Sequence, residues 1–120
     1  MSSYAGLTVA DGTLYVTDAN DLVWAAKPND GAGIWKQEAL RYRTLTAPAV
    51  VGNNLVVGDL EGYVHLLARS DGRILGRQRL TKADIQAQPL VAGGRVFVLA
   101  ADGTLAALST SASPPPTTAR

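Results

Sequence analysis

An all-β fold is predicted by three features of the 120-residue sequence. Short apolar runs rich in valine, leucine and tyrosine are separated by turn-forming pairs such as Asp-Gly and Gly-Asn. No stretch of more than about ten residues shows the 3.6-residue periodicity of an amphipathic helix. The same order of apolar runs and turns also returns every 41 residues along the chain. Together these features indicate short strands joined by hairpins and arranged in structural repeats.

Aligning the chain with itself at a shift of 41 residues superimposes both apolar and turn positions. Val9 falls on Val50 and Val91, which places the first strand of each repeat at equivalent positions. Turn residues and prolines follow the same register: Asp18 with Asp59, Asp30-Gly31 with Asp71-Gly72, Pro48 with Pro89, and Gly62 with Gly103. Four hairpin-linked strands in each repeat of about 40 to 45 residues are typical of β-propeller blades. The sequence therefore predicts two complete four-stranded antiparallel blades and three strands of a third.

The turn signals divide each repeat into four strands. In the first repeat the expected strands cover 6–10, 13–18, 22–26 and 33–38, and the later repeats carry the same strands 41 residues further on. The turns between them are Asp11-Gly12, Asn20-Asp21 and Asp30-Gly31. Such pairs adopt positive φ readily and suit tight hairpins whose twist matches that of the strands.

The third strand of each repeat is apolar almost throughout, as in Val23-Trp24-Ala25-Ala26 and Val64-His65-Leu66-Leu67. A strand with one face in water would alternate apolar and polar residues. We therefore expect blades that pack face to face and cover both sides of the strand. A β-sandwich is the alternative fold, although it requires no constant repeat.

The repeats cover about 4–44, 45–85 and 86–108, so we expect residues 1–108 to be the C-terminal part of a longer β-propeller. The third repeat holds only three strands, and in a closed propeller the other end of the chain commonly supplies the missing fourth. Residues 109–120 are rich in serine, threonine and proline. The consecutive prolines there cannot donate to a sheet ladder, so we expect a disordered tail.

The charges and the cysteine content limit the partners and the chemistry. The chain has 11 basic and 10 acidic residues, with no block of clustered basic residues. This balance argues against nucleic acid as a partner, because such binding depends on several adjacent phosphate contacts. No cysteine is present, which excludes disulfides and thiolate chemistry.

Residues able to catalyse a reaction are few. His65 is the single histidine, and a structural role is favoured because no second histidine or cysteine could complete a metal site. Four aspartates recur in register beside turns, whereas catalytic residues are usually unique in a repeat array: Asp18, Asp59, Asp30 and Asp71. We therefore expect turn-forming aspartates, no catalytic residue, no metal and no cofactor.

Two inter-blade connections, 39–46 and 80–88, are the longest loops. Successive antiparallel strands place both connections on the same face as the second turns, and the first and third turns on the opposite face. Aromatic and arginine side chains on a rigid scaffold often contact protein partners. The candidate contact residues are Arg41, Tyr42, Arg43, Leu45 and Ile85. The alternative is that both loops are merely solvated connections.

Trp35 follows the third turn of the first repeat, and Gly76 occupies the equivalent place in the second. This arrangement resembles the repeat of pyrroloquinoline-quinone-type propellers, in which the tryptophan docks one blade on the next. The resemblance implies a fold family and, by itself, no cofactor.

Residues 4–109 also resemble the C-terminal blades of the BamB family, the outer-membrane-protein assembly factors of Gram-negative bacteria. The resembling segments are 6–16, 45–50, 101–105 and, most specifically, the run from Asn54 to His65. The resemblance implies an eight-bladed ring tethered as a lipoprotein to the periplasmic face of the outer membrane. Contact with the membrane would be made only through a lipid anchor upstream of this segment.

The resemblance further implies a non-catalytic protein-binding scaffold of the β-barrel assembly machinery. Its partners would be a BamA-type barrel assembly protein and unfolded outer-membrane proteins, with no contact residues carried over. The alternative function is that of a fragment of a pyrroloquinoline-quinone-dependent dehydrogenase, which uses the same repeat. Such an enzyme would need calcium-ligating carboxylates and cofactor-stacking residues near the ring centre.

Overall fold

The computed structural model describes residues 4–109, which form eleven β-strands and, within that range, no helix. The first repeat contains β1 (Tyr4–Ala10), β2 (Thr13–Asp18), β3 (Val23–Ala26) and β4 (Gly33–Gln37). The second contains β5 (Ala49–Val51), β6 (Asn54–Gly58), β7 (Tyr63–Ala68) and β8 (Ile74–Arg79). The third contains β9 (Leu90–Ala92), β10 (Arg95–Leu99) and β11 (Leu105–Ser109). The tail was predicted to begin at residue 109, but Ser109 belongs to β11, so this boundary is wrong by one residue. The remainder of the predicted tail lies outside the described residues.

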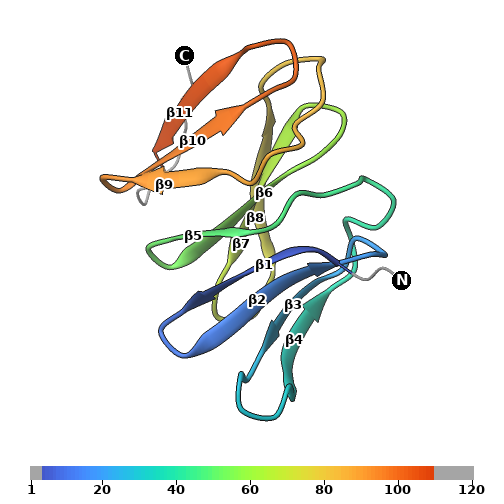
Figure 1. Ribbon diagram of the computed structural model, residues 1–120, viewed down its shortest axis with the longest axis vertical. Helices are drawn as coiled ribbons and strands as arrows, with labels where there is room; N and C mark the ends of the chain where they lie inside the picture. The colour runs from blue at the N-terminus through green and yellow to red at the C-terminus, as the bar shows by residue number, and fades with distance from the viewer. Residues whose placement is uncertain (1–3, 110–120) are drawn as a thin grey trace.

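The strands form three antiparallel sheets, in the orders β1-β2-β3-β4, β5-β6-β7-β8 and β11-β10-β9. We call these sheets blades 1, 2 and 3, and they follow one another along the long axis of the molecule (Figure 1). The strand pairing keeps the 41-residue register: Val16 pairs with Trp24, Val57 with His65, and Val98 with Ala106. The predicted blades and their strand order are thus confirmed.

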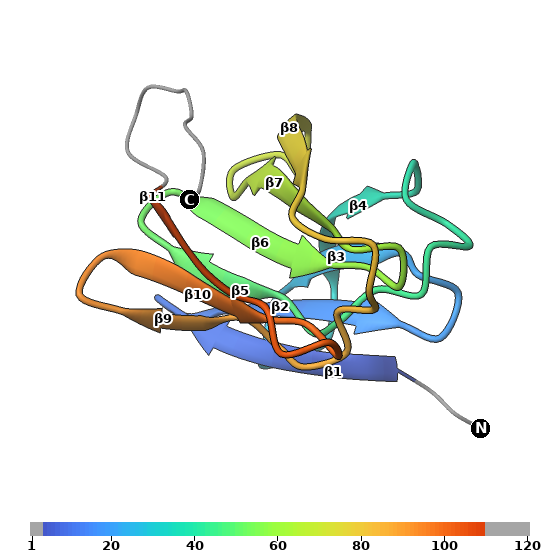
Figure 2. The ribbon, with the colours of Figure 1, turned by 90° about the horizontal axis from the view of Figure 1, so that it is seen from above.

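The first strands of the blades lie toward one side of the molecule, and the outer strands β4 and β8 lie toward the other (Figure 2). Strand β5 contacts both β1 and β9. The sheets therefore converge at their first strands, as blades do around the axis of a ring. This arrangement leaves β4 and β8 as the outer edge strands of blades 1 and 2.

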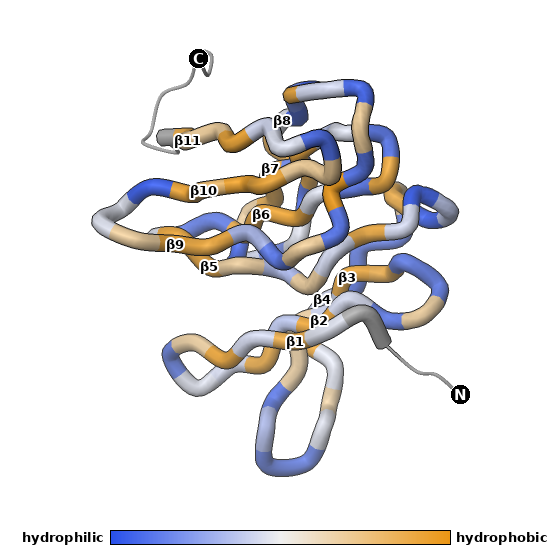
Figure 3. Tube along the Cα trace, turned by 45° about the horizontal axis from the view of Figure 1, so that its top comes forward, coloured by the Kyte–Doolittle hydropathy of each residue, from blue (hydrophilic) through white to orange (hydrophobic). Residues whose placement is uncertain are grey.

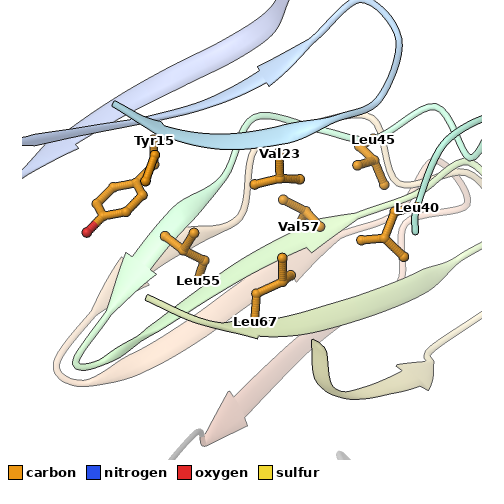
Figure 4. Packing of buried hydrophobic residues seen from close by; sticks show 8 residues of the cluster. Tyr15, Val23, Leu40, Leu45, Leu55, Val57 and Leu67 are labelled. Carbon is orange, nitrogen blue, oxygen red and sulfur yellow. The ribbon is translucent and has the colours of Figure 1, made fainter. Parts of the chain in front are cut away.

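Two apolar cores hold the three blades together. The first fills the space between blades 1 and 2, where Tyr15 and Val23 face Leu55, Val57 and Leu67 (Figure 4). The second lies between blades 2 and 3: it contains Val51, Val56, Val64, Val96 and Val98. Blade 2 is therefore covered on both faces, which explains its nearly continuous apolar strands. Hydrophilic residues are concentrated in the turns and connections (Figure 3).

The turns and connections are divided between two faces, as predicted. On the connection face, which comprises residues 19–22, 38–48, 60–62, 80–89 and 101–103, the connections bond to the second turns. The backbone N–H of Leu80 donates to the carbonyl oxygen of Gly62 at 2.8 Å, and that of Ala101 donates to Asp84 at 2.8 Å. On the opposite face, Arg69 beside the third turn of blade 2 donates to Asp11 Oδ2 at 2.7 Å, in the first turn of blade 1.

Trp35 docks blade 1 on blade 2, which confirms the role predicted for it. Its ring N–H donates to the carbonyl oxygen of Arg69 at 2.9 Å. The ring also lies against Gly72, where an added Cβ would overlap it. Gln37 adds a hydrogen bond of 2.8 Å to the Gly72 carbonyl oxygen. The edge strand of one blade therefore holds the third turn of the next.

Candidate protein-interaction surface

The first connection, residues 38–48, is held in a strained but well-bonded conformation. Tyr42 and Thr44 have φ values of 70° and 57°, in the left-handed region that residues with a Cβ seldom adopt. Such residues persist only where surrounding bonds enforce them, and they are concentrated at functional sites. Here the Asp21 carboxylate accepts the backbone N–H of Leu45 at 2.9 Å, and the Arg43 carbonyl oxygen accepts that of Leu60 at 3.2 Å. The connection is therefore a fixed surface feature.

The five candidate contact residues divide into two groups. Arg41 and Tyr42 are exposed, and Tyr42 retains 89% of its accessible surface. Arg43 is partly buried because it bonds to Asp59. By contrast, Leu45 and Ile85 are 4% and 1% exposed and belong to the first and second cores. The structure thus brings Arg41, Tyr42 and Arg43 to the surface, while Leu45 and Ile85 close the cores beneath it.

The second connection, residues 80–89, is positioned by Ile85. The Ile85 backbone N–H donates to the carbonyl oxygen of Asp59 at 3.0 Å, and its side chain occupies the space over Gly58. A Cβ at Gly58 would overlap Ile85, so only glycine allows this approach. At the surface of the loop, Thr81 donates its hydroxyl to Asp102 Oδ2 at 2.8 Å. This bond joins the second connection to the second turn of blade 3.

A buried carboxylate lies beneath the first connection. Asp59 Oδ1 accepts the backbone N–H groups of Glu61 and Tyr63 at 2.9 and 3.0 Å. Its Oδ2 contacts His65 Nε2 at 2.8 Å and accepts Arg43 Nη1 at 3.1 Å. Burial alone raises the pKa of Asp59, but these hydrogen bonds outweigh it and hold the pKa below its ordinary value of 3.8. Asp59 therefore links the second turn, strand β7 and the connection as an ionised group.

His65 is completely buried, which agrees with the structural role predicted for it. Burial lowers the pKa of His65 below its ordinary value of 6.5, and the bond to Asp59 offsets this only in part. His65 Nδ1 is buried and has no partner among the described residues. A protonated ring would place an unpaired N–H donor there, so the neutral ring with its proton on Nε2 fits the site.

The same arrangement recurs in blade 1 with different residue types. Asp18 accepts the backbone N–H groups of Asn20 and Leu22, and its Oδ2 accepts the Trp24 ring N–H at 2.7 Å. The recurring aspartates are thus turn formers, as predicted. Asp18 and Asp59 also anchor the third strand through a ring N–H, a second role that was not predicted from the sequence. The available signal was a ring with an N–H, Trp24 or His65, six residues after each aspartate.

The described residues 4–109 contain no group of three or more His, Cys, Asp or Glu side chains that could hold a metal ion. Within the same range no helix is long and apolar enough to cross a membrane.

The fold and this surface define a class of protein. Blades repeated in one register, stacked face to face and docked through Trp35, make this chain part of a β-propeller. The repeats are of the pyrroloquinoline-quinone-like type, by the family model that matches them. A family model described as outer membrane protein assembly factor BamB matches residues 1–59 and 28–113. The chain belongs to this family.

Curated relatives with that description agree. The chain is 42% identical over 106 residues to BamB of Pseudomonas aeruginosa, which covers 88% of this chain and 28% of the relative. It is 42% identical over 110 residues to BamB of Legionella pneumophila, and the alignment covers 92% of this chain and 28% of the relative. With BamB of Escherichia coli K12 the identity is 39% over 98 residues, and the alignment covers 81% of this chain and 25% of the relative. The chain therefore spans about a quarter of the length of these relatives.

Solved structures show the same blade arrangement. The crystal structure of BamB from Moraxella catarrhalis matches with a TM-score of 0.80 at 27% identity, over 92% of this chain and 33% of that one. A quinohemoprotein alcohol dehydrogenase from Pseudomonas putida HK5 matches with a TM-score of 0.71 at 22% identity, over 88% and 20%. The second likeness concerns the fold alone.

Proposed function

We propose that this chain is a segment of a non-catalytic protein-binding scaffold that aids the folding and insertion of outer-membrane proteins. The observation that carries the proposal is the 42% identity with the assembly factor BamB of Pseudomonas aeruginosa over 88% of the chain. Identity at this level, over an alignment long enough to reach all three blades, supports a shared role as well as a shared fold. The complete protein would be an eight-bladed ring at the periplasmic face of the outer membrane, anchored by a lipid upstream of this segment.

The geometry of the connection face suits a scaffold. The blades are fixed by two cores and by Trp35, so the loops that they carry have little freedom to lose when a partner binds. Tyr42 stands exposed beside Arg41, with the Arg41 guanidinium 5.9 Å from the Tyr42 ring. Exposed tyrosine and arginine side chains are frequent anchors in protein interfaces. The expected partners are a BamA-type barrel assembly protein and unfolded outer-membrane proteins.

A segment exchange tests the proposal in a cell. In BamB of Escherichia coli K12, the matched segment is replaced by the matching part of this chain, and the hybrid is expressed in cells that lack their own BamB. We expect outer-membrane protein levels to return to those given by the unaltered protein. The control is the hybrid with Gly72→Ala, which weakens the docking of blade 1 on blade 2. A hybrid that accumulates normally yet leaves these levels as in the deletion strain would contradict the proposal.

The dehydrogenase alternative has its own test. The purified chain is mixed with pyrroloquinoline quinone and calcium, and quinone binding and dye-linked alcohol oxidation are measured. The scaffold proposal predicts neither binding nor oxidation above the level of a quinone-free sample. Tight binding accompanied by oxidation would favour an enzyme instead.

A further inference from the structure

Three arginines surround one aromatic ring at the outer end of blade 2. The guanidinium carbons of Arg43, Arg77 and Arg79 lie 5.5, 5.1 and 5.3 Å from the centroid of the Tyr63 ring. We call these four residues the arginine cluster. Each contact is within the range of a cation–π interaction, which is strongest where water is partly excluded.

The strand register explains how the cluster forms. Arg79 pairs with Tyr63, and Arg77 pairs with His65, across strands β7 and β8. Directly paired residues in an antiparallel sheet, and residues two apart in a strand, project from the same face. Arg77, Arg79 and Tyr63 therefore share the face of blade 2 that points toward blade 1. Arg43 reaches the ring from the connection.

The cluster carries positive charge that the described residues do not balance. Arg43 is paired with Asp59, whose buried carboxylate also bonds to His65. Arg79 Nε donates to the backbone carbonyl oxygens of Glu61 and Thr81 and has no carboxylate partner within residues 4–109. Arg77 is exposed and makes no hydrogen bond or ion pair in that part of the chain. Two guanidinium groups are thus held side by side without an anion.

At the equivalent positions of blade 1, the positive charge is neutralised by a carboxylate. The positions 41 residues before Arg77 and Arg79 hold Lys36 and Glu38, which form an ion pair of 3.4 Å. Lys36 also lies over the Trp24 ring, at 5.1 Å from its centroid. Blade 2 keeps the cation over a ring but replaces the neutralising glutamate by a second arginine. The excess charge is therefore a property of blade 2 and not of the repeat.

We propose that the arginine cluster binds an acidic, extended segment of a partner protein. Arg77 and Arg79 are two residues apart on a strand, which separates their backbones by about 7 Å. Carboxylates at alternate positions of an extended peptide have the same spacing, and guanidinium groups bind carboxylates through paired hydrogen bonds. Strand β8 is also an edge strand, so its outer main-chain groups lie beside the cluster. The inference rests on the proposed function because it supplies the partner chemistry of a protein-binding scaffold.

Fluorescence anisotropy tests this binding with a defined probe. The 120-residue chain is titrated into a labelled peptide of alternating glutamate and threonine, and into a peptide with glutamine in place of glutamate. We expect the acidic peptide to bind at least about tenfold more tightly, with an affinity that falls as salt rises. The double variant Arg77→Gln/Arg79→Gln should lose this preference. Arg95→Gln, an exposed strand arginine of blade 3, is the matched control and should keep it.

A second variant addresses the ring itself. Tyr63→Leu installs the residue type that the first repeat holds at this position, Leu22, and removes the cation–π contacts. We expect a several-fold weaker binding of the acidic peptide, with circular dichroism verifying that the blades are intact. Equal binding of the acidic and neutral peptides, or equal effects of Arg77→Gln/Arg79→Gln and Arg95→Gln, would overturn the proposal.

Vesicles containing an anionic phospholipid provide the remaining comparison. Binding to vesicles that depends on Arg77 and Arg79, without binding to the acidic peptide, would assign the cluster to lipid headgroups and overturn the peptide proposal. The segment exchange in cells is a separate readout. If the hybrid fails in cells while the chain still prefers the acidic peptide, the assembly role alone is refuted. If the hybrid functions in cells while the chain shows no preference for the acidic peptide, the acidic-segment proposal alone is refuted.

Discussion

Asp59 joins three elements through a single buried carboxylate. It accepts the backbone N–H of Glu61 in the second turn of blade 2 and that of Tyr63 at the start of β7. It also bonds to the ring of His65 in β7 and to the guanidinium of Arg43 in the first connection. Asp18 plays the same part in blade 1 but is only partly buried and has no arginine partner among residues 4–109. The two aspartates therefore form a natural pair for measuring how burial and charge contribute to the stability of a blade.

Replacing Asp59 by alanine should be far more damaging than replacing Asp18. Asp59→Ala removes the carboxylate that bonds to Arg43 and His65 and leaves both groups without this partner. We expect the free energy of unfolding to fall by about 3 kcal/mol. Asp18→Ala removes hydrogen bonds near solvent and should cost about 1 kcal/mol. Urea denaturation of both variants measures the difference. Equal losses would show that Asp59 is no more than a turn former.

The same residues predict how stability depends on pH. The pKa of His65 is lower in the folded chain than in the unfolded chain, so below pH 6.5 the unfolded chain binds a proton more readily. The stability of the fold therefore decreases as the pH drops below 6.5. The pKa of Asp59 is also lowered, so its contribution is present above pH 3.8 and is lost as the pH falls further. Urea denaturation at a series of pH values should therefore show two successive losses.

His65→Gln separates the two steps. The glutamine amide can still donate to Asp59 but does not titrate, so the first loss should disappear and the second should persist. A wild-type stability that is constant between pH 7 and 5 would contradict the assignment. So would an unchanged first step in the His65→Gln variant.

At the scale of elements, the docking of one blade on the next depends on a glycine as much as on a tryptophan. Gly72 and Gly31 are repeat equivalents with φ values of 78° and 72°. An added Cβ would meet nothing within 4 Å at Gly31, but at Gly72 it would overlap the Trp35 ring. Both positions disfavour a side chain through their backbone conformation, and only Gly72 does so through contact as well.

This pair separates backbone strain from blade docking. We expect Gly31→Ala to destabilise the chain by about 1 kcal/mol, and Gly72→Ala by at least about twice as much. Combining Gly72→Ala with Trp35→Leu should recover part of the additional loss, because the overlap is then relieved. Thermal unfolding followed by circular dichroism gives the comparison. Equal losses of stability in the two variants would show that overlap with the Trp35 ring adds no destabilisation.

The strands and turns could be predicted because local residue types determine them, whereas the docking role of Trp35 was implied by the resemblance to pyrroloquinoline-quinone-type propellers. Asp-Gly and related pairs mark the hairpins, and the 41-residue register transfers each assignment to the next repeat. The orientation of the connection side chains could not be predicted in this way. Leu45 and Ile85 pass over the ends of the cores, and only the three-dimensional path shows that they point inward.

The arginine cluster was also not predicted, although the proximity of two of its four residues could have been predicted from the sequence. Arg77 and Arg79 lie two apart on an expected strand, which places them on one face. Their meeting with Arg43 depends on how the first connection folds back over blade 2. Contacts between segments distant in sequence, such as Arg43 with Tyr63, leave no local signature.

At the scale of the whole molecule, the outward faces of blades 1 and 3 differ from the covered faces of blade 2. On blade 3, Leu90, Leu99 and Leu105 are 66%, 53% and 66% exposed. On blade 1, Leu7 and Val9 are 44% and 60% exposed. Contiguous exposed apolar surface favours association with another surface. The edge strands β4 and β8 add unpaired main-chain groups to this tendency.

We therefore expect the 120-residue chain to associate with itself as its concentration rises. Leu99→Lys/Leu105→Lys should shift sedimentation velocity profiles toward the monomer, because charges cannot be buried in such a contact without penalty. Leu60→Lys, on the connection face, is the control and should leave association unchanged. A single monomeric species from micromolar to millimolar concentration, with a cooperative melt at high temperature, would contradict this expectation.

The scaffold proposal requires that the connection face, and not the opposite face, meets the assembly partners. Site-specific photocrosslinking in the hybrid protein measures this directly, with the photoreactive residue at position 42 on the connection face or at position 53 in the first turn of blade 2. We predict adducts recognised by antibodies against the BamA-type barrel protein or an outer-membrane protein from position 42 and not from position 53. Equal adducts from both positions, or none from position 42 in a hybrid that is abundant and folded, would contradict the proposal.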